Sequence, residues 1–184
     1  DIRGGRNITL AQTEADNLTT VTVTAGKNGV LGYWGSFWDT TTQTAGTTTS
    51  SYVVTLNSAD PDNDGVAVTD GNKIVPTTPG NYNVSLSAQL TNTDSQAHDA
   101  IFWFRRNGTD IADSASVVTV PSTHGGRNGQ LIFYVDLALR FQVGDYLQIA
   151  WAVTDTNVKL ETIAAGTTPV YPRSPSVIIT VVQV

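Results

Sequence analysis

The chain has 184 residues, enough for one well-packed domain with an additional arm but few for two independent cores. Its 10 Lys and Arg residues against 16 Asp and Glu residues give a net charge of −6, which argues against a nucleic-acid partner. No apolar run approaches the roughly 18 residues that cross a bilayer, so membrane insertion is not expected. Cysteine is absent, which excludes disulfides, thiolate nucleophiles and sulfur-ligated metal sites.

Residues 1–32 are predicted to form an arm or linker with one or two strands. Val21 and Val23 alternate with threonine in a period-two strand pattern, and glycine-containing stretches lie on both sides of it. The first residues contain neither an initiator Met nor the basic-then-apolar order of a signal peptide, so we expect a processed or truncated chain. This segment is the candidate for an assembly arm.

From Tyr33 onward the pattern is that of an all-β domain. Aromatic residues crowd positions 33–38 and are expected to be buried, whereas the Thr-rich stretch after them is typical of a strand edge or loop. Short alternating stretches then recur between turn signals such as "DNDG", "RNGTD" and "QVGD". Residues 131–141 are rich in aromatic and β-branched side chains, which favours a strand over a helix. Roughly ten such strands predict a two-sheet antiparallel sandwich or barrel.

Several motifs of residues 33–184 occur in the order known from one family of jelly rolls. A "PG-x-Y" turn opens a strand, an "NG" turn ends the next, and a "GD" pair that follows a leucine precedes a late alternating strand; these are Pro79, Gly80, Tyr82, Asn107, Gly108, Leu139, Gly144, Asp145, Tyr146, Leu147 and Ile149. The segment therefore resembles the globular C1q/tumour-necrosis-factor-like domain. The resemblance implies an antiparallel two-sheet jelly-roll sandwich preceded by the short arm.

The amino-acid sequence of residues 95–116 and 174–184 resembles that of C1q-like domains in virion structural proteins of tailed, cyanophage-like phages. The chain has no collagen-like run and no cysteine, both of which are frequent in animal members of the family. The resemblance implies a homotrimer on the virion surface, in contact with a capsid or fibre protein. Five aromatic residues are the candidates for its core or trimer interface: Phe37, Trp38, Trp103, Tyr134 and Trp151.

The stretch "DPDNDG", residues 60–65, has the opening of a calcium-binding loop. Asp60, Asp62 and Asp64 alternate as oxygen ligands, and Gly65 permits a sharp bend. The twelfth position is Gly71 rather than the glutamate that closes an EF-hand loop. A solvated acidic turn is the favoured interpretation, so no cofactor is expected and calcium is the alternative.

Enzymatic activity is not expected. His98 and His124 are the only histidines, and both lie in polar, loop-like contexts without a G-x-S-x-G nucleophile motif. The only glutamates, Glu14 and Glu161, are far apart in sequence, and most aspartates fall in turns. No carboxylate pair of a glycosidase is therefore evident.

Two functions remain. Arg105, Arg106, Arg127 and His124 are candidates for a patch that binds an anionic glycan. The favoured interpretation of the two strand arginines is that one lies on the surface and the other forms an ion pair between subunits. The first hypothesis is a non-enzymatic virion protein, a trimeric head decoration, cement or fibre module. The second is a trimeric C1q-like module that recognises host-surface carbohydrate through loops at residues 58–65 and 123–129.

Overall fold

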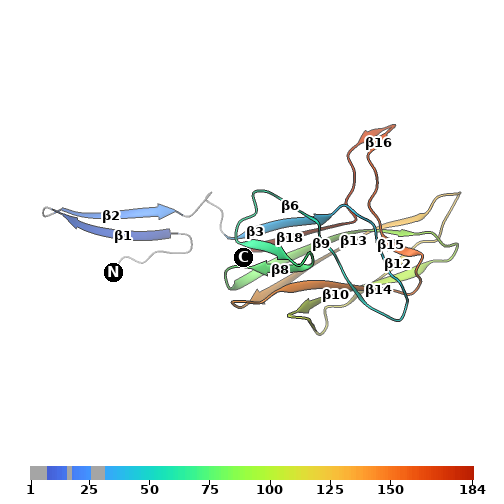
Figure 1. The fold of residues 1–184 in the computed structure, drawn as a ribbon, viewed down its shortest axis with the longest axis horizontal. Helices are drawn as coiled ribbons and strands as arrows, with labels where there is room; N and C mark the ends of the chain where they lie inside the picture. Colours follow the sequence, from blue (N-terminus) through green and yellow to red (C-terminus); the bar gives the residue numbers. More distant parts are fainter. Residues whose placement is uncertain (1–7, 16–17, 26–31) are drawn as a thin grey trace.

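A computed structural model describes the backbone of residues 8–15, 18–25 and 32–184, and the side chains of residues 32–184. Its regular elements in these ranges are all strands, paired antiparallel, and two seven-stranded sheets of them pack as two layers (Figure 1). This confirms the prediction of an all-β antiparallel sandwich. Within the same ranges no helix is long and apolar enough to cross a membrane.

One layer is built around the longest strands and is called the β9 sheet. Its order is β4-β15-β9-β18-β3-β6. β13 also pairs with β9, along the edge opposite to the one that pairs with β18. The strands are β3 (Trp34–Asp39), β4 (Gln43–Thr44), β6 (Ser58–Ala59), β9 (Gly80–Asn92), β13 (Gly129–Phe141), β15 (Val158–Leu160) and β18 (Val177–Gln183). Residues 131–141 are therefore a strand, as their composition predicted.

The second layer is called the β10 sheet. Its order is β11-β10-β14-β8-β7, with β12 paired to β10 and β5 paired to β14. The strands are β5 (Tyr52–Val53), β7 (Val66–Thr69), β8 (Lys73–Pro76), β10 (His98–Arg106), β11 (Thr109–Asp110), β12 (Ser116–Val120) and β14 (Leu147–Val153).

The core lies between the two sheets because each strand buries every second side chain. In β9 the buried positions are Tyr82, Val84, Leu86, Ala88 and Leu90, and the residues between them are only half-buried. Across the layers the ring of Phe102 on β10 stacks on that of Phe133 on β13, with centroids 4.6 Å apart.

The turn at Asn107 and Gly108 connects β10 to β11 and also holds the loop before β14. Both residues have positive φ, 52° and 79°, which suits an Asn-Gly hairpin turn. Asn107 Nδ2 donates to Asp145 Oδ1 at 2.7 Å, and Gln142 N donates to Asp145 Oδ2 at 2.7 Å. The Gln142 amide and then Asn107 lower the pKa of Asp145 below its usual value.

Two hairpins lie outside the sandwich sheets. β1 (Ile8–Ala15) and β2 (Leu18–Ala25) form a two-stranded antiparallel sheet within the segment that was expected to be an arm. β16 (Gly166–Thr167) and β17 (Val170–Tyr171) form a second hairpin, which projects beyond the layer of β9, β13 and β18 in Figure 1.

The sandwich has two distinct ends. The chain enters at Tyr33 beside the C-terminal strand, where Gln183 N donates to Tyr33 O at 2.8 Å; we call this the arm end. The loops of residues 93–97, 121–128 and 154–157 lie at the opposite end, called the loop end, because they follow β9, β12 and β14 there. The 13 residues of β9 separate the two ends by about 40 Å.

Candidate functional site

The outward side of β3, β18, β9 and β13 forms a continuous surface, here called the β9 outer face. One row across it runs Trp38, Ile178, Ser87 and Tyr134, because each of these residues is the register partner of the next. Directly opposed residues in antiparallel strands project to the same side of a sheet, so the four side chains share this face.

Apolar side chains on the β9 outer face are unusually exposed. Ile132 and Tyr134 on β13 are 64% and 60% exposed, and Ile178 and Val182 on β18 are 40% and 38% exposed. Single exposed apolar residues are ordinary, but several on one face indicate an interaction surface. Here they lie on the two strands that flank β9, whose own outward side chains are uncharged Asn, Ser, Gln and Thr.

The same face carries little charge. The four strands contain three charged residues, of which Asp39 is buried, leaving Asp136 and Arg140 exposed with opposite signs. Asp136 accepts hydrogen bonds from the hydroxyls of Ser85 and Tyr134, which lower its pKa below the usual range. The β9 outer face is therefore close to neutral, although the whole chain has a net charge of −6.

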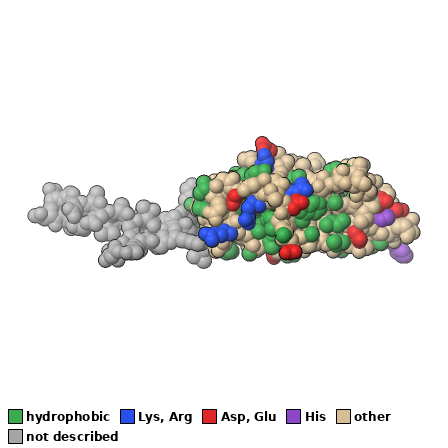
Figure 2. Space-filling model, turned by 90° about the horizontal axis from the view of Figure 1, so that it is seen from below, with side chains coloured by type: hydrophobic (Ala, Val, Ile, Leu, Met, Phe, Trp, Pro, Cys, Tyr) green, Lys and Arg blue, Asp and Glu red, His purple; other side chains and the backbone are tan. Residues whose placement is uncertain are grey.

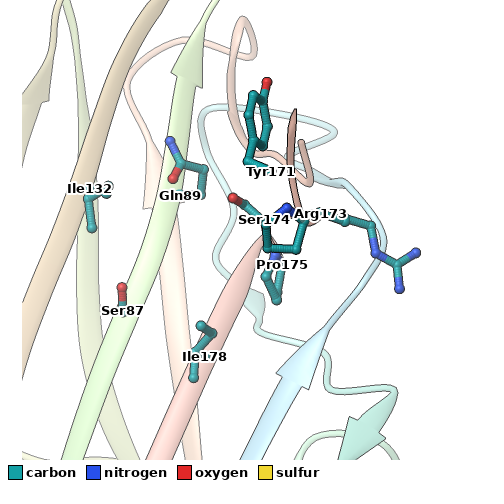
Figure 3. Close-up of a pocket in the computed structure, with 9 residues that line it drawn as sticks. Ser87, Gln89, Ile132, Tyr171, Arg173, Ser174, Pro175 and Ile178 are labelled. Carbon is teal, nitrogen blue, oxygen red and sulfur yellow. The ribbon is translucent and has the colours of Figure 1, made fainter. Parts of the chain in front are cut away.

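A cavity of about 350 Å³ lies where this face meets the chain segment that follows β17. Tyr171 and the stretch after it form one side, and the strands carrying Gln89, Ile132 and Ile178 form the other (Figure 3). The remaining lining residues are Ser87, Pro172, Arg173, Ser174 and Pro175. An aromatic ring beside hydroxyl, amide and guanidinium groups suits stacking and hydrogen bonding to a polyhydroxyl ligand.

The five aromatic residues predicted for the core or interface divide into three groups. Phe37 and Trp151 are buried in the core. Trp38 and Tyr134 project from the β9 outer face, in the same register row. Trp103 projects outward from the β10 sheet, where its Nε1 donates to Asp110 Oδ1 at 2.7 Å.

The four predicted ligand-binding residues do not form one site. Arg105 and Arg106 lie at the C-terminal end of β10, whereas His124 and Arg127 belong to a loop tied to the start of that strand by the 2.8 Å bond from Thr123 N to Asp94 O. Nine residues of β10 separate the two pairs by about 26 Å.

The two pairs also differ in their contacts. Arg105 Nε donates to Asp110 Oδ1 at 2.5 Å, and the Arg106 guanidinium lies over the Phe141 ring, 5.9 Å from its centroid. His124 and Arg127 are exposed and pair through backbone hydrogen bonds of 2.9 and 3.0 Å. The second pair is thus the more accessible to a ligand.

The acidic loop at residues 60–65 fastens β3 rather than gathering its carboxylates. Asp60 Oδ1 accepts the amide of Asp62 at 2.9 Å, and Asp64 exchanges two backbone hydrogen bonds with Trp34, of 2.8 and 2.9 Å. Asp60, Asp62 and Asp64 do not converge to metal-binding distance within the described part of the chain. This arrangement is the one expected of a structural turn.

A different acidic group is present at the loop end. Asp94, His98 and Asp155 each offer one ligand atom, and these atoms lie within 4.8 Å of one another. His98 Nε2 is 2.7 Å from Asp94 Oδ2 and 3.8 Å from Asp155 Oδ2. The bond to His98, followed by the Ser95 amide, lowers the pKa of Asp94. This group was not predicted from the sequence, because Asp155 joins it only through the pairing of β10 with β14.

Comparison with known proteins adds no assignment. No protein-family model matches the chain, and no curated protein matches it. The function is therefore inferred from the surfaces and side-chain groups described above.

Proposed function

We propose that the chain is a non-enzymatic structural protein of a phage virion, a trimeric head decoration, cement or fibre module displayed on the particle surface. The observation that carries the proposal is the nearly neutral β9 outer face, with its exposed apolar side chains on β13 and β18. The phage origin rests on the sequence resemblance to C1q-like virion domains. A partner that buries this surface would remove its apolar side chains from water.

The strand order supports a jelly roll of the C1q/TNF-like type. Eight strands divide into two sets of four, β3-β18-β9-β13 and β8-β14-β10-β12. The first and last strands of the domain, β3 and β18, are neighbours, and most successive members of the eight alternate between the sheets. Two sheets joined by such crossing connections are typical of double Greek-key sandwiches.

A second copy of the chain is the partner that fits the β9 outer face best. Copies with a net charge of −6 repel one another at most surfaces, but this face exposes only one acidic and one basic residue on its four strands. The face also offers Trp38 and Tyr134, aromatic residue types that are enriched in interfaces, and the apolar Ile178 in the same row. In a closed threefold ring the contacts are heterologous, so each copy would offer one part of this face to one neighbour and another part to the other.

The two ends of the sandwich suit a module that is held at one end and displayed at the other. Residue 33 enters at the arm end, so a contact made by residues 1–32 with a capsid or fibre protein would hold that end. The loop end would then lie farthest from the attachment, about 40 Å away along β9.

A pair of matched substitutions tests the proposal. Ile132→Asp places a charge on the β9 outer face, and Val117→Asp places the same charge on the outward side of the β10 sheet. The two residues are 64% and 66% exposed, and each lies on a strand paired to one neighbour among the described strands. We expect Ile132→Asp to reduce the mass measured by light scattering to that of a monomer, whereas Val117→Asp leaves a trimer.

Equal masses for the two variants would contradict the proposed interface, because a charge on the β9 outer face would then affect assembly no more than a charge on the β10 sheet. Circular dichroism of each variant controls for folding. Both positions are exposed, so neither substitution should disturb the core.

Carbohydrate binding is the second candidate, and the cavity beside Tyr171 is the observation that favours it. A trimeric lectin-like module would use this aromatic side chain and the neighbouring Arg173 to hold a host-surface glycan. On this alternative Tyr171→Ala abolishes binding on a glycan array without changing the mass, whereas binding unaffected by the substitution would exclude the cavity as the glycan site.

A further inference from the structure

The loop end contains three metal-ligating side chains that the proposed function does not use. His98 begins β10, Asp94 lies four residues earlier in the preceding loop, and Asp155 lies in the loop after β14. All three are partly buried, with 19% of the His98 side chain and about a third of each carboxylate exposed. Figure 2 shows the histidine side chains at one end of the molecule, beside acidic ones.

Both carboxylates are anchored by one oxygen and present the other to His98. Asp94 Oδ1 accepts the Ser95 amide at 2.6 Å, and its Oδ2 lies 2.7 Å from His98 Nε2. Asp155 Oδ1 accepts the amide and the side-chain nitrogen of Asn157 at 2.8 and 2.9 Å, while its Oδ2 lies 3.8 Å from the same imidazole nitrogen. Three donor atoms from two loops thus point to one location.

The loops that carry these residues are fastened to each other. Thr93 N donates to Asn157 O at 3.2 Å, and Thr93 Oγ1 bonds Asn157 Oδ1 at 2.9 Å. A third loop joins them through the bond from Thr123 N to Asp94 O. The donor atoms are therefore held by a scaffold that is independent of their own contacts, which lowers the entropy lost when a ligand is bound.

We propose that Asp94, His98 and Asp155 bind a divalent first-row transition-metal ion of the zinc class. One imidazole nitrogen with two carboxylate oxygens is a donor set that such ions accept, and three protein ligands leave a position for water or a further ligand. Calcium and magnesium prefer sets made of oxygen alone, so the imidazole disfavours them.

The geometry requires only small adjustments. Bonds of about 2.0–2.2 Å in a tetrahedral site separate neighbouring donors by roughly 3.3–3.5 Å. The separations of His98 Nε2 from Asp94 Oδ2 and Asp155 Oδ2, 2.7 and 3.8 Å, lie on either side of that value. The ligand atoms of all three residues already lie within 4.8 Å of one another.

The site is tested by titrating the full-length chain, without a histidine tag and after removal of metal by a chelator, with ZnCl₂ in a calorimeter. We expect saturable binding of one Zn²⁺ per chain. Asp155→Asn and His98→Gln should each weaken Kd at least tenfold, since each removes one of three ligands. The matched control is His124→Gln, which removes the other histidine of the chain and should leave Kd unchanged.

Two further readouts keep the test decisive. Co²⁺ bound to the wild-type chain should give visible absorption that Zn²⁺ displaces and Ca²⁺ does not. Thermal melting of Asp155→Asn checks that the substitution of this partly buried side chain leaves the fold intact. Absence of saturable Zn²⁺ binding, or binding that His124→Gln abolishes and Asp155→Asn does not, would overturn the proposal. The mass of the chain reports the proposed trimer separately.

Discussion

The two outer faces of the sandwich differ in how their polar groups are satisfied. On the β10 sheet, charged groups find partners on their own face: Arg105 bonds Asp110, and Lys73 Nζ bonds Asp70 Oδ2 at 2.8 Å. Figure 2, seen from the side of β10 and β14, shows acidic and basic side chains scattered among hydrophobic ones. On the β9 outer face the carboxylate of Asp136 is held by neutral hydroxyls, most other polar side chains are uncharged, and exposed apolar side chains lie on β13 and β18.

This difference indicates that the outer side of the β10 sheet is complete in a single chain, whereas the β9 outer face suits contact with a partner. The ion pairs of the β10 sheet are complete within one chain, and such exposed pairs contribute little to stability. The apolar side chains of the β9 outer face gain nothing from exposure to water. A second copy that covers them would account for the contrast between two faces built on the same core.

The largest expected effect comes from the core that both faces share. Phe102→Ala removes the ring that stacks on Phe133 between the sheets, and we expect the free energy of unfolding to fall by about 3–5 kcal/mol. Val117→Ala, on an exposed side chain, should change it by less than about 0.5 kcal/mol. Urea denaturation at one protein concentration measures both. Similar losses for the two variants would contradict the assignment of Phe102 to a core shared by the sheets.

A smaller effect is expected at the buried carboxylate that ends β3. Asp39 Oδ1 accepts from Thr41 N at 2.7 Å and Asn57 Nδ2 at 3.2 Å, and its Oδ2 accepts from Thr55 Oγ1 at 2.8 Å. Asp39→Ala leaves these donors without their acceptor and should lower the free energy of unfolding by about 1–3 kcal/mol. The melting temperatures of Asp39→Ala and of Asp110→Ala, which removes an exposed carboxylate on the other face, are compared. A larger loss for Asp110→Ala would reverse the account of the two faces.

The smallest effect is the response of the two faces to acid and salt. The pKa of Asp110 is lowered by its bonds to Arg105 and then Trp103, and that of Asp136 by Ser85 and then Tyr134. A lowered pKa stabilises the fold above the ordinary value of 3.8 and loses that contribution as pH falls through the folded pKa.

Melting temperatures between pH 6 and pH 2 should therefore depend less on pH in Asp110→Asn and in Asp136→Asn than in the wild type. Added salt should reduce the Asp110 contribution, because its partner Arg105 is charged, but not the Asp136 contribution. An equal response to salt at both positions would contradict the difference in their partners.

Most strands could be predicted because their signals are local. In β9 the alternation from Tyr82 to Leu90 follows a turn at Pro79 and Gly80, and these cues need no knowledge of the partner strand. The segment at 33–38 was harder, because Trp34 and Trp38 project outward while Phe37 faces the core, so aromatic side chains occupy both faces of β3. The two-residue strands of the β16–β17 hairpin are too short to show a period.

The sites were less predictable because they depend on which strands pair. Arg105 and Arg127 were predicted to share one ligand-binding patch because both are basic. The structure places them near opposite ends of β10, so they lie far apart. Conversely, His98 and Asp155 are separated by a long stretch of chain and meet through the β10–β14 register. The only local signal was Asp94, four residues before His98. The outward apolar positions of β13 were visible as alternation, but which of its two sides faces the core became evident only from its pairing with β9.

The mass of the purified wild-type chain in solution, measured by light scattering over a range of concentrations with and without a chelator, tests the central claim most directly. The account predicts three times 19.6 kDa, about 59 kDa, in both conditions, because the proposed interface contains no metal ligand. A mass of 19.6 kDa at every concentration would contradict it, since the β9 outer face would then remain exposed to water.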